Sequence, residues 1–333
     1  MSKRITMADV AREAGVSLMT VSRVINKKGE VNATTRKQVL AIVEQLGYRP
    51  SGIARGLATH HTRTLGLVVP DIANSFFAEL ARGAEHAAYA QEYNVFLCNA
   101  NEDQSRELAV LRSLEEQRVD GVLLCSSRLE EPVLREAVTH HAAVVLFNRT
   151  LGGDNIGSVM IDDVYGGQIA TQHLLRTGHQ AVGFLAGPQS SFSGRLRTQG
   201  YRQAMAQVGI HDVDAWISYC PPTVTGGREA ALNLLNSQSA LTALFCYNDL
   251  VAVGALQACA ESGRNIPGDV AVVGFDDIPL AALVTPTLTT CHLPRYELGR
   301  QSMQLLLECI GGCNEECNTR VVRPELVIRA SAP

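Results

Sequence analysis

The sequence predicts an α/β protein with a small all-α head and a body of two doubly wound, parallel-sheet subdomains. Residues 1–46 contain three short amphipathic segments, each preceded by a residue that can cap a helix. From residue 65 onward, apolar runs rich in Val, Leu and Ile alternate with segments of helical periodicity. Such alternation is typical of parallel sheets that helices cover on both faces. The runs are too many for one sheet of ordinary size, so we expect two subdomains.

The head is expected to form a helix-turn-helix followed by a third helix. Thr6 can cap the first helix, and Gly15 can adopt the positive φ that the following turn needs. Ser17 can cap a second helix that ends near Asn26, and Asn32 can cap the third. Two short helices joined by a glycine-containing turn form the helix-turn-helix motif.

Charge is divided unevenly along the chain. Residues 1–61 hold ten Lys and Arg against four Asp and Glu, a net charge of +6. The other 272 residues hold nineteen against twenty-nine, a net charge of −10. A small basic head on an acidic body predicts that the head binds a polyanion. On charge alone, a chance excess of basic residues is the alternative.

The stretch that joins head and body is expected to be a linker. Residues 50–58, Pro-Ser-Gly-Ile-Ala-Arg-Gly-Leu-Ala, contain two glycines and few apolar residues. A helix this short does not hold in water by itself. We therefore expect the segment to become helical only when a partner orders it.

The body is expected to alternate strands and helices. Apolar runs predict strands at residues 65–69, 95–98, 121–125, 142–147, 158–161, 181–185, 243–246 and 270–275. Amphipathic segments predict helices at residues 76–91, 105–117, 164–177, 195–208, 226–236 and 249–263.

Polar and aromatic residues follow several of these strands. An open α/β sheet binds ligands beyond the carboxyl ends of its strands, where this chain places amides, carboxylates, guanidinium groups and two Phe rings. Such groups suit a polyhydroxylated ligand. At any one position, however, an Asp or Asn can equally serve to cap the next helix, and we assign Asp163 and Asp249 to capping.

Signatures of catalysis are missing from the sequence. It contains no Walker-type loop and no G-x-S-x-G or H-E-x-x-H motif, so we expect neither an enzyme nor a cofactor. Nine cysteines, no export signal and no apolar run long enough to span a membrane predict a cytoplasmic protein with reduced thiols.

Seven of the nine cysteines fall into two groups. Four lie in apolar runs and are expected to be small buried side chains: Cys98, Cys125, Cys246 and Cys291. Three others have helical spacing, namely Cys309, Cys313 and Cys317. Because Gly311-Gly312 interrupts that helix and no His lies close in sequence, no metal site is expected, and the role of these three thiols stays open.

The head resembles a known family in a specific motif. The segment Asp9-Val10-Ala11-x-x-Ala14-Gly15-Val16-Ser17-x-x-Thr20-Val21-Ser22-Arg23-Val24-Ile25-Asn26 resembles the lactose-repressor/galactose-repressor family of bacterial transcription regulators. Further stretches extend the resemblance in order along the whole chain: Thr35-Arg36, Leu46-Gly47-Tyr48-Arg49-Pro50, Ala54-Arg55-Gly56-Leu57-Ala58, Gly178-His179, Asn248-Asp249 and Gly274-Phe275-Asp276-Asp277. The body is also similar to periplasmic sugar-binding proteins, which share its expected fold.

The resemblance implies a division of labour along the chain. Residues 1–49 form a helix-turn-helix DNA-binding domain, and residues 50–63 form a hinge helix and linker. Residues 64–333 form an effector-binding and dimerisation domain, whose two periplasmic-binding-protein-like subdomains divide near residues 162 and 290. The implied protein is a homodimeric repressor of a carbohydrate-utilisation operon. It binds a palindromic operator, and a sugar or sugar-acid effector releases it.

The resemblance also implies site residues on DNA. Leu18, Met19 and Arg23 are the base-reading candidates, because Arg23 can bond bidentately to guanine and the other two offer apolar contact. Leu57 is implied as a wedge in the minor groove. The candidates for phosphate contact are Thr6, Ser17, Thr20, Ser22, Asn26, Asn32, Thr35 and Tyr48.

The implied effector site lies between the subdomains. Its candidates are Asn74, Phe76, Phe77, Asn148, Arg149, Arg197, Asn248, Asp276 and His292. Pro221-Pro222 stands where relatives often have an aromatic ring, so the identity of the ligand does not carry over.

Two alternatives stay open. A purine-like ligand could act as a co-repressor instead of a sugar acting as an inducer. A sugar-binding transport or sensor protein would share the fold of the body, but it would need an export signal and would lack residues 1–58.

Overall fold

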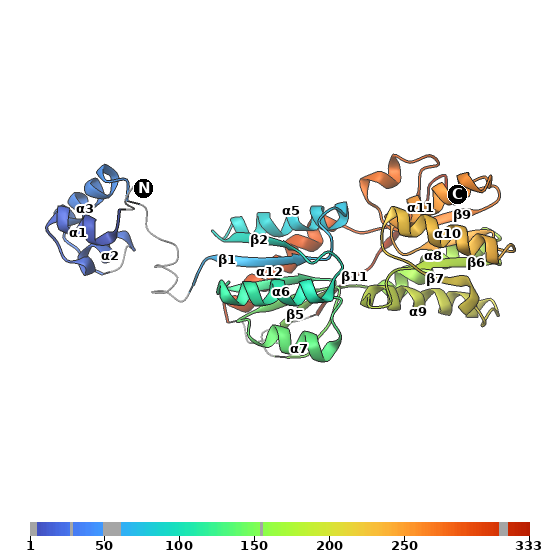
Figure 1. Ribbon diagram of the computed structural model, residues 1–333, viewed down its shortest axis with the longest axis horizontal. Coiled ribbons are helices and arrows are strands. Elements are labelled where there is room, and N and C mark those ends of the chain that lie inside the picture. Colours follow the sequence, from blue (N-terminus) through green and yellow to red (C-terminus); the bar gives the residue numbers. More distant parts are fainter. Residues whose placement is uncertain (1–4, 27–28, 49–60, 154–155, 313–318) are drawn as a thin grey trace. The chain divides into compact units, whose positions relative to one another are not determined.

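A computed structural model describes residues 5–26, 29–48, 61–153, 156–312 and 319–333. The chain forms two compact units, residues 1–62 and 63–333, each with its own hydrophobic core (Figure 1). Among the described residues, no helix is long and apolar enough to cross a membrane.

The head consists of α1 (Met7–Ala14), α2 (Leu18–Ile25) and α3 (Ala33–Gln45). The predicted caps are confirmed: Thr6 forms a reciprocal capping box with Asp9, and Ser17 Oγ accepts from the Thr20 amide at 3.1 Å. Asn32 caps α3, and Gly15 has the expected left-handed backbone, with φ of 61°.

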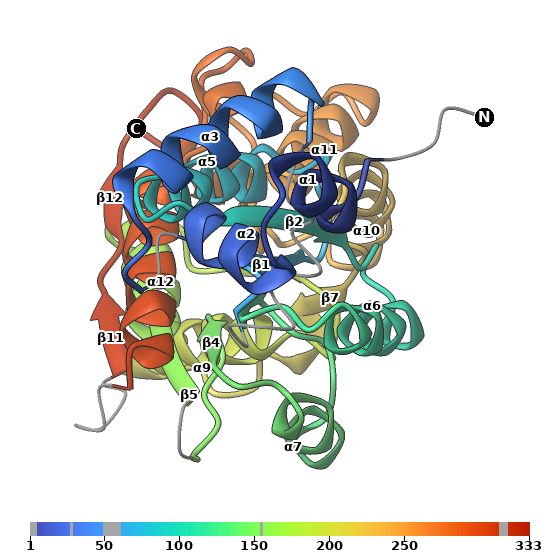
Figure 2. The same ribbon diagram turned by 90° about the vertical axis from the view of Figure 1, so that its left-hand side faces the viewer.

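The first sheet of the body is entirely parallel. Its strand order is β11-β5-β4-β3-β1-β2. Its strands are β1 (Thr64–Val69), β2 (Asn94–Asn99), β3 (Gly121–Cys125), β4 (Val144–Phe147), β5 (Ile156–Ile161) and β11 (Thr319–Val322). Its helices are α5 (Ser75–Tyr89), α6 (Gln104–Glu116), α7 (Glu131–Thr139) and α12 (Arg295–Ile310). Figure 2 shows α5 and α12 on one face of the sheet and α6 and α7 on the other.

The second sheet repeats this design, in the order β12-β10-β9-β8-β6-β7. Its strands are β6 (Val182–Ala186), β7 (Ile217–Tyr219), β8 (Ala243–Cys246), β9 (Ala271–Asp276), β10 (Thr289–His292) and β12 (Glu325–Val327). Its helices are α8 (Asp163–Arg176), α9 (Phe192–Gln207), α10 (Val224–Ser237) and α11 (Asp249–Glu261), with short 3-10 turns at Asp214–Trp216 and Pro279–Ala282. Only β12 runs antiparallel to its neighbour. The predicted fold class is confirmed.

The chain passes between the two sheets three times. The passages lie between β5 and α8, between β10 and α12, and between β11 and β12. The third passage, at Arg323-Pro324, places the last two strands in different sheets. Each sheet therefore depends on chain segments that are far apart in the sequence.

Burial agrees with most of the cysteine predictions. Cys125, Cys246 and Cys291 are buried, as expected. The prediction for Cys98 was wrong: its side chain is partly exposed because β2 is an edge strand with one unpaired side. Cys309 is buried in α12, whereas Cys313 and Cys317 lie outside the described residues.

Pairs of glycines bring the main helix pairs into close contact. A Cβ atom on Gly83 of α5 would lie 1.9 Å from the carbonyl oxygen of Tyr296 in α12. A Cβ atom on Gly299 of α12 would lie 1.9 Å from the carbonyl oxygen of Leu80 in α5. The pairs α8 with α9 and α10 with α11 meet in the same way, at Gly167 with Gly200 and at Gly227 with Gly254. Only glycine allows backbones to approach this closely.

Gly83→Ala is expected to destabilise the protein by about 3 kcal/mol, because the added methyl group has to push two helix backbones apart. Gly152→Ala is the matched control, since no atom lies within 4 Å of the added Cβ. Urea denaturation of both variants checks this expectation. Equal stabilities would show that the contact between α5 and α12 is not tight.

Candidate functional site

The start of α2 presents the candidate base-reading residues to solvent. Leu18 and Met19 are 53% and 63% exposed, which is unusual for large apolar side chains next to a packed core. Arg23 lies one turn further along and is also exposed. The exposed Ser17 caps the same helix end, whose free amide groups favour an anion such as a phosphate.

The other head candidates differ in exposure. Thr6 and Asn32 are exposed, and both side chains cap helices. Tyr48 is only 9% exposed and belongs to the hydrophobic core of the head. Four candidates are partly buried: Thr20, Ser22, Asn26 and Thr35. Leu57 lies outside the described residues.

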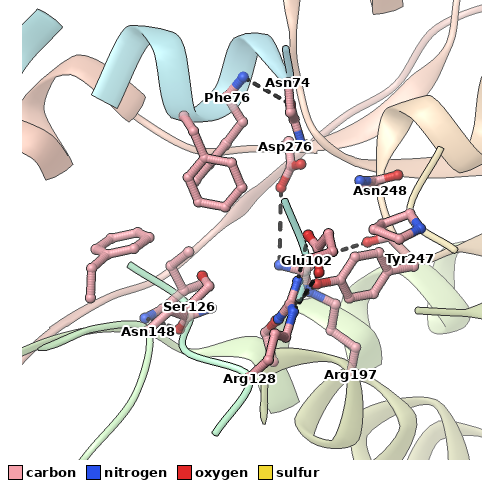
Figure 3. A pocket seen from close by; sticks show the side chains of 15 residues that line it. Asn74, Phe76, Glu102, Ser126, Arg128, Asn148, Arg197, Tyr247, Asn248 and Asp276 are labelled. Carbon is pink, nitrogen blue, oxygen red and sulfur yellow. Dashed lines mark hydrogen bonds and ion pairs between the residues drawn. The ribbon is translucent and has the colours of Figure 1, made fainter. Parts of the chain in front are cut away.

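A narrow polar cleft lies at the carboxyl ends of the strands in the body. Its lining residues are Asn74, Phe76, Phe77, Glu102, Ser126, Arg128, Phe147, Asn148, Ile161, Ser193, Arg197, Pro222, Tyr247, Asn248 and Asp276. In Figure 3, Ser126 and Asn148 enter the cleft from one side, and Tyr247 and Asn248 enter it from the other. The free volume is about 30 Å³, far below the several hundred cubic ångströms of ordinary ligand pockets. A sugar-sized ligand therefore requires the cleft to widen.

Four cleft residues have a left-handed backbone. The φ angles of Glu102, Ser126, Asn148 and Asp276 are 56°, 47°, 56° and 107°. Each follows or ends a strand, and residues other than glycine rarely adopt this conformation. Strained backbone of this kind gathers at functional sites, where it directs a side chain that the regular strand would point elsewhere.

Two amides of the cleft also cap helices. Asn74 Oδ1 accepts from the Phe76 amide at 3.0 Å and caps α5. Asn248 Oδ1 accepts from the Val251 amide at 2.9 Å and caps α11. Each side chain keeps its amide NH₂ group for other partners. Asn74 and Asn248 therefore each cap a helix and line the cleft.

The assignment of Asp163 and Asp249 to capping was wrong. The caps are the preceding residues, Asp162 and Asn248, because a capping side chain has to lie just outside the first helical turn. Asp163 instead accepts from Arg197 Nε at 2.7 Å and from Asn148 Nδ2 at 2.9 Å. Asp249 accepts from Thr290 Oγ1 at 2.6 Å and from the Ile278 amide at 2.8 Å.

Arg197 is the most constrained charge in the cleft. Its Nη1 donates to the Tyr247 carbonyl oxygen at 2.5 Å, and its Nη2 lies 4.0 Å from Asp276 Oδ1. Its guanidinium also lies over the ring of Phe275, 3.6 Å from the ring centre. Burial opposes its charge, but Asp163 and Asp276 more than offset this, and the pKa of Arg197 is raised.

Asp276 has an unusual protonation equilibrium. Burial raises its pKa from the ordinary 3.8 to about 7, although Arg197 lowers it and Asp163 raises it further. Near neutral pH this carboxyl group can therefore both donate and accept hydrogen bonds. Such a group suits a ligand hydroxyl, which also does both.

Three residues that line the cleft were not predicted from the sequence, namely Arg128, Glu102 and Tyr247. Arg128 pairs bidentately with Glu102, through Nε to Oε2 at 2.6 Å and Nη2 to Oε1 at 3.0 Å. The Tyr247 hydroxyl lies 3.0 Å from Ser191 Oγ and 3.3 Å from Ser193 Oγ. These residues follow strands too, so the strand-end rule could have found them, but no motif singled them out.

Two predicted effector residues lie away from the cleft lining. Arg149 donates from Nη2 to the Leu129 carbonyl oxygen at 3.0 Å, and its guanidinium lies over the Phe192 ring. His292 Nδ1 lies 2.8 Å from Asp277 Oδ2. In the described ranges, His, Cys, Asp and Glu side chains form no group of three that could hold a metal ion.

Comparison with known proteins gives matches to two family models. The model for bacterial regulatory proteins of the lacI family matches residues 6–51. The model for periplasmic binding proteins and the sugar binding domain of the LacI family matches residues 62–328. Catabolite control protein A of Priestia megaterium is 37% identical over 303 residues, which cover 91% of each chain.

Further similarities extend over almost the whole chain. The HTH-type transcriptional repressor PurR of Photobacterium profundum is 36% identical over 328 residues, which cover 98% of each chain. The lac repressor dimer bound to operator and the anti-inducer ONPF superposes with a TM-score of 0.85, at 27% identity and 99% coverage of each chain. These relatives are transcription regulators, not enzymes.

The protonation of Asp276 predicts an effect on stability. A carboxyl group whose pKa is raised by folding binds its proton more tightly in the folded state, so stability falls as pH rises from about 4 to about 7. Asp276→Asn is therefore expected to match the wild type below about pH 4 and to be more stable at pH 8, by on the order of 4 kcal/mol at most. Thermal denaturation across this range measures the difference.

Asp277→Asn is the control for this experiment. Burial acts to raise the pKa of Asp277, but its bonds with Arg329 and His292 outweigh this and lower the pKa. The control should therefore lose stability at neutral pH, and the loss should shrink only as pH falls below about 4. A pH-independent gain for Asp276→Asn would refute the proposed protonation.

Proposed function

Because the chain belongs to the lacI family of bacterial regulatory proteins, we propose that it represses a carbohydrate-utilisation operon and responds to a sugar or sugar-acid effector. The chain is a DNA-binding transcriptional regulator with a ligand-binding domain. In the proposal it binds a palindromic operator as a homodimer in the cytoplasm, and the effector releases it.

One observation carries this proposal: both subdomains supply polar groups to the same cleft. Asn74, Ser126 and Asn148 come from the first subdomain. Arg197, Asn248 and Asp276 come from the second. A ligand that bonds to both sets favours one angle between the subdomains, and in a dimer that angle affects the spacing of the two DNA-binding heads.

The composition of the cleft supports a sugar. Amides, carboxyl groups and guanidinium groups can bond to several hydroxyls, and the rings of Phe76 and Phe147 can lie against the C–H face of a sugar. The family model for residues 62–328 includes sugar-binding domains in its description. The same rings could instead stack on a purine, and the relatives named PurR keep a purine-like co-repressor as the second candidate.

In our proposal each region of the chain has its own role. Residues 1–49 bind DNA, residues 50–63 form the hinge helix and linker, and residues 64–333 bind the effector and form the dimer.

Large exposed apolar side chains support a homodimer. Phe96 and Leu97 lie on the edge strand β2, and Leu283 is 77% exposed in the second subdomain. Apolar side chains exposed in this way are common at interfaces between subunits.

The exposed start of α2 supports the proposed DNA contact. Val21 and Val24 of α2 pack in the core of the head, whereas Leu18, Met19 and Arg23 are exposed and free to enter the major groove. The net charge of +6 on residues 1–61 supports binding to phosphates, so affinity should fall steeply as the salt concentration rises.

Arg23→Ala is expected to lower discrimination at one base pair of each half-site by about 1–3 kcal/mol, because a bidentate contact to guanine is lost. Arg12→Ala is the matched control, since it removes the same charge from the exposed face of α1. Mobility shift with single-substitution operators measures both. A uniform loss across all operators for Arg23→Ala would make Arg23 a phosphate contact instead.

Asn248→Ser tests the cleft without removing the helix cap, because Ser caps helices nearly as well as Asn. The variant is expected to bind the effector about 10-fold more weakly and to bind the operator normally. Asp103→Ser makes a similar exchange at the cap of α6, outside the cleft lining, and should leave effector affinity unchanged. Normal effector affinity in Asn248→Ser would remove Asn248 from the site.

The proposed response is tested by operator binding with neutral sugars, sugar acids and purine bases. Release by a sugar or a sugar acid is the expected result. Tighter operator binding in the presence of a purine base would show that the effector is a co-repressor and not an inducer. Because Arg197 is buried with Asp163, truncating it would leave an unpaired charge and destabilise the fold, so Asn248→Ser is the sharper probe of the response.

A further inference from the structure

Arg128 holds a buried hydrogen-bond donor without an acceptor in the wall of the cleft. The residue is 3% exposed, and no hydrogen-bond partner for its Nη1 lies among the described residues. A buried N–H group without a partner is rare in folded proteins and destabilising. Glu102 accepts from Nε and from one N–H group of Nη2, so Nη1 is the guanidinium nitrogen that makes no hydrogen bond to the described residues.

The position of Arg128 is fixed from several directions. Its backbone amide donates to Glu107 Oε2 at 3.0 Å, and its carbonyl oxygen accepts from Gln104 Nε2 at 2.8 Å. Ser127 Oγ donates to the same Glu107 carboxylate. Tyr247, from the other subdomain, lies next to the guanidinium. The donor therefore stays at the point where the two subdomains meet.

Both guanidinium groups that line the cleft are already paired with carboxylates. Arg128 is paired with Glu102, and Arg197 is paired with Asp163 at 2.7 Å. Asp276 adds a further carboxyl group that is partly ionised near neutral pH. Arg149, a further guanidinium near this end of the sheet, does not line the cleft, and neither does Arg295, whose charge lowers the pKa of Asp276. A carboxylate on the ligand would meet net repulsion, whereas a neutral hydroxyl or ring oxygen would not.

We propose that Arg128 is a specificity-determining residue of this cleft and that it selects a neutral sugar, whose hydroxyl or ring oxygen accepts a hydrogen bond from Arg128 Nη1. This inference rests on the proposed function and narrows its effector from sugars and sugar acids to neutral sugars. Arg128 thereby joins the first subdomain to the ligand, as Arg197 does the second.

Arg128→Lys separates ligand binding from a purely structural role. A lysine keeps the positive charge that pairs with Glu102 but lacks the second guanidinium nitrogen. Arg329→Lys is the matched control, because Arg329 also pairs with a carboxylate, Asp277, at 2.7 Å but does not line the cleft. Operator binding by each variant verifies that it is folded.

The measurement is titration calorimetry of the full chain with D-ribose, D-glucose, D-galactose, cellobiose, D-gluconate and D-galactonate. At least one neutral sugar should bind the wild type more tightly than the sugar acids do. Arg128→Lys should weaken that sugar by about 10- to 100-fold, and Arg329→Lys should not change it. Each monodeoxy analogue of that sugar lacks one hydroxyl group. The analogue without the hydroxyl that accepts from Arg128 Nη1 should bind the wild type and Arg128→Lys equally.

The possible failures are distinguishable. If a sugar binds the wild type and Arg128→Lys equally well, the role of Arg128 is overturned and the sugar-responsive function stands. If a sugar acid binds more tightly than every neutral sugar, the neutral class is overturned. If neither sugars nor sugar acids bind the wild type, the proposed function fails and this inference fails with it.

Discussion

The buried ion pair between Arg197 and Asp163 is the interaction on which the arrangement of the cleft depends. Asp163 also accepts from Asn148, so a single carboxylate holds side chains from both subdomains. Removing charges from water costs several kcal/mol for each ion, and only a complete set of partners offsets this cost. The pair therefore tolerates few geometries, and in the proposed switch a ligand that alters its surroundings would change the angle between the subdomains.

Several residues that line the cleft also hold the ends of helices and strands. Asn74 and Asn248 hold the ends of α5 and α11 while they face the cleft. Asn148 and Asp276 have left-handed backbones at the ends of β4 and β9. A displacement of any of these side chains is thus also a displacement of a helix end or a strand end. A small ligand that bonds to these side chains would therefore act directly on the helices and strands whose ends they hold.

Much of the fold could be predicted from local sequence, and the rest depended on distant contacts. A few consecutive residues are enough to predict the helix caps and the continuous apolar strands. The caps are Thr6, Ser17 and Asn32. The helices α7 and α12 and the strands β7, β10, β11 and β12 were not predicted, because these strands are short and β11 and β12 are only partly buried. In the cleft, rules for strand ends suggested Asn148 and Asp276. They could not show that Arg128 meets Glu102, since that pairing joins two loops 26 residues apart.

In the proposed switch, the ligand in the cleft and the operator compete through the angle between the subdomains. The most direct test is the affinity of the effector for the free protein and for the protein saturated with operator. Linkage requires the effector to bind the operator complex more weakly, by the same factor by which it weakens operator binding, typically about 5- to 150-fold. Equal effector affinity in the two states would contradict the account, because the cleft would then be uncoupled from DNA.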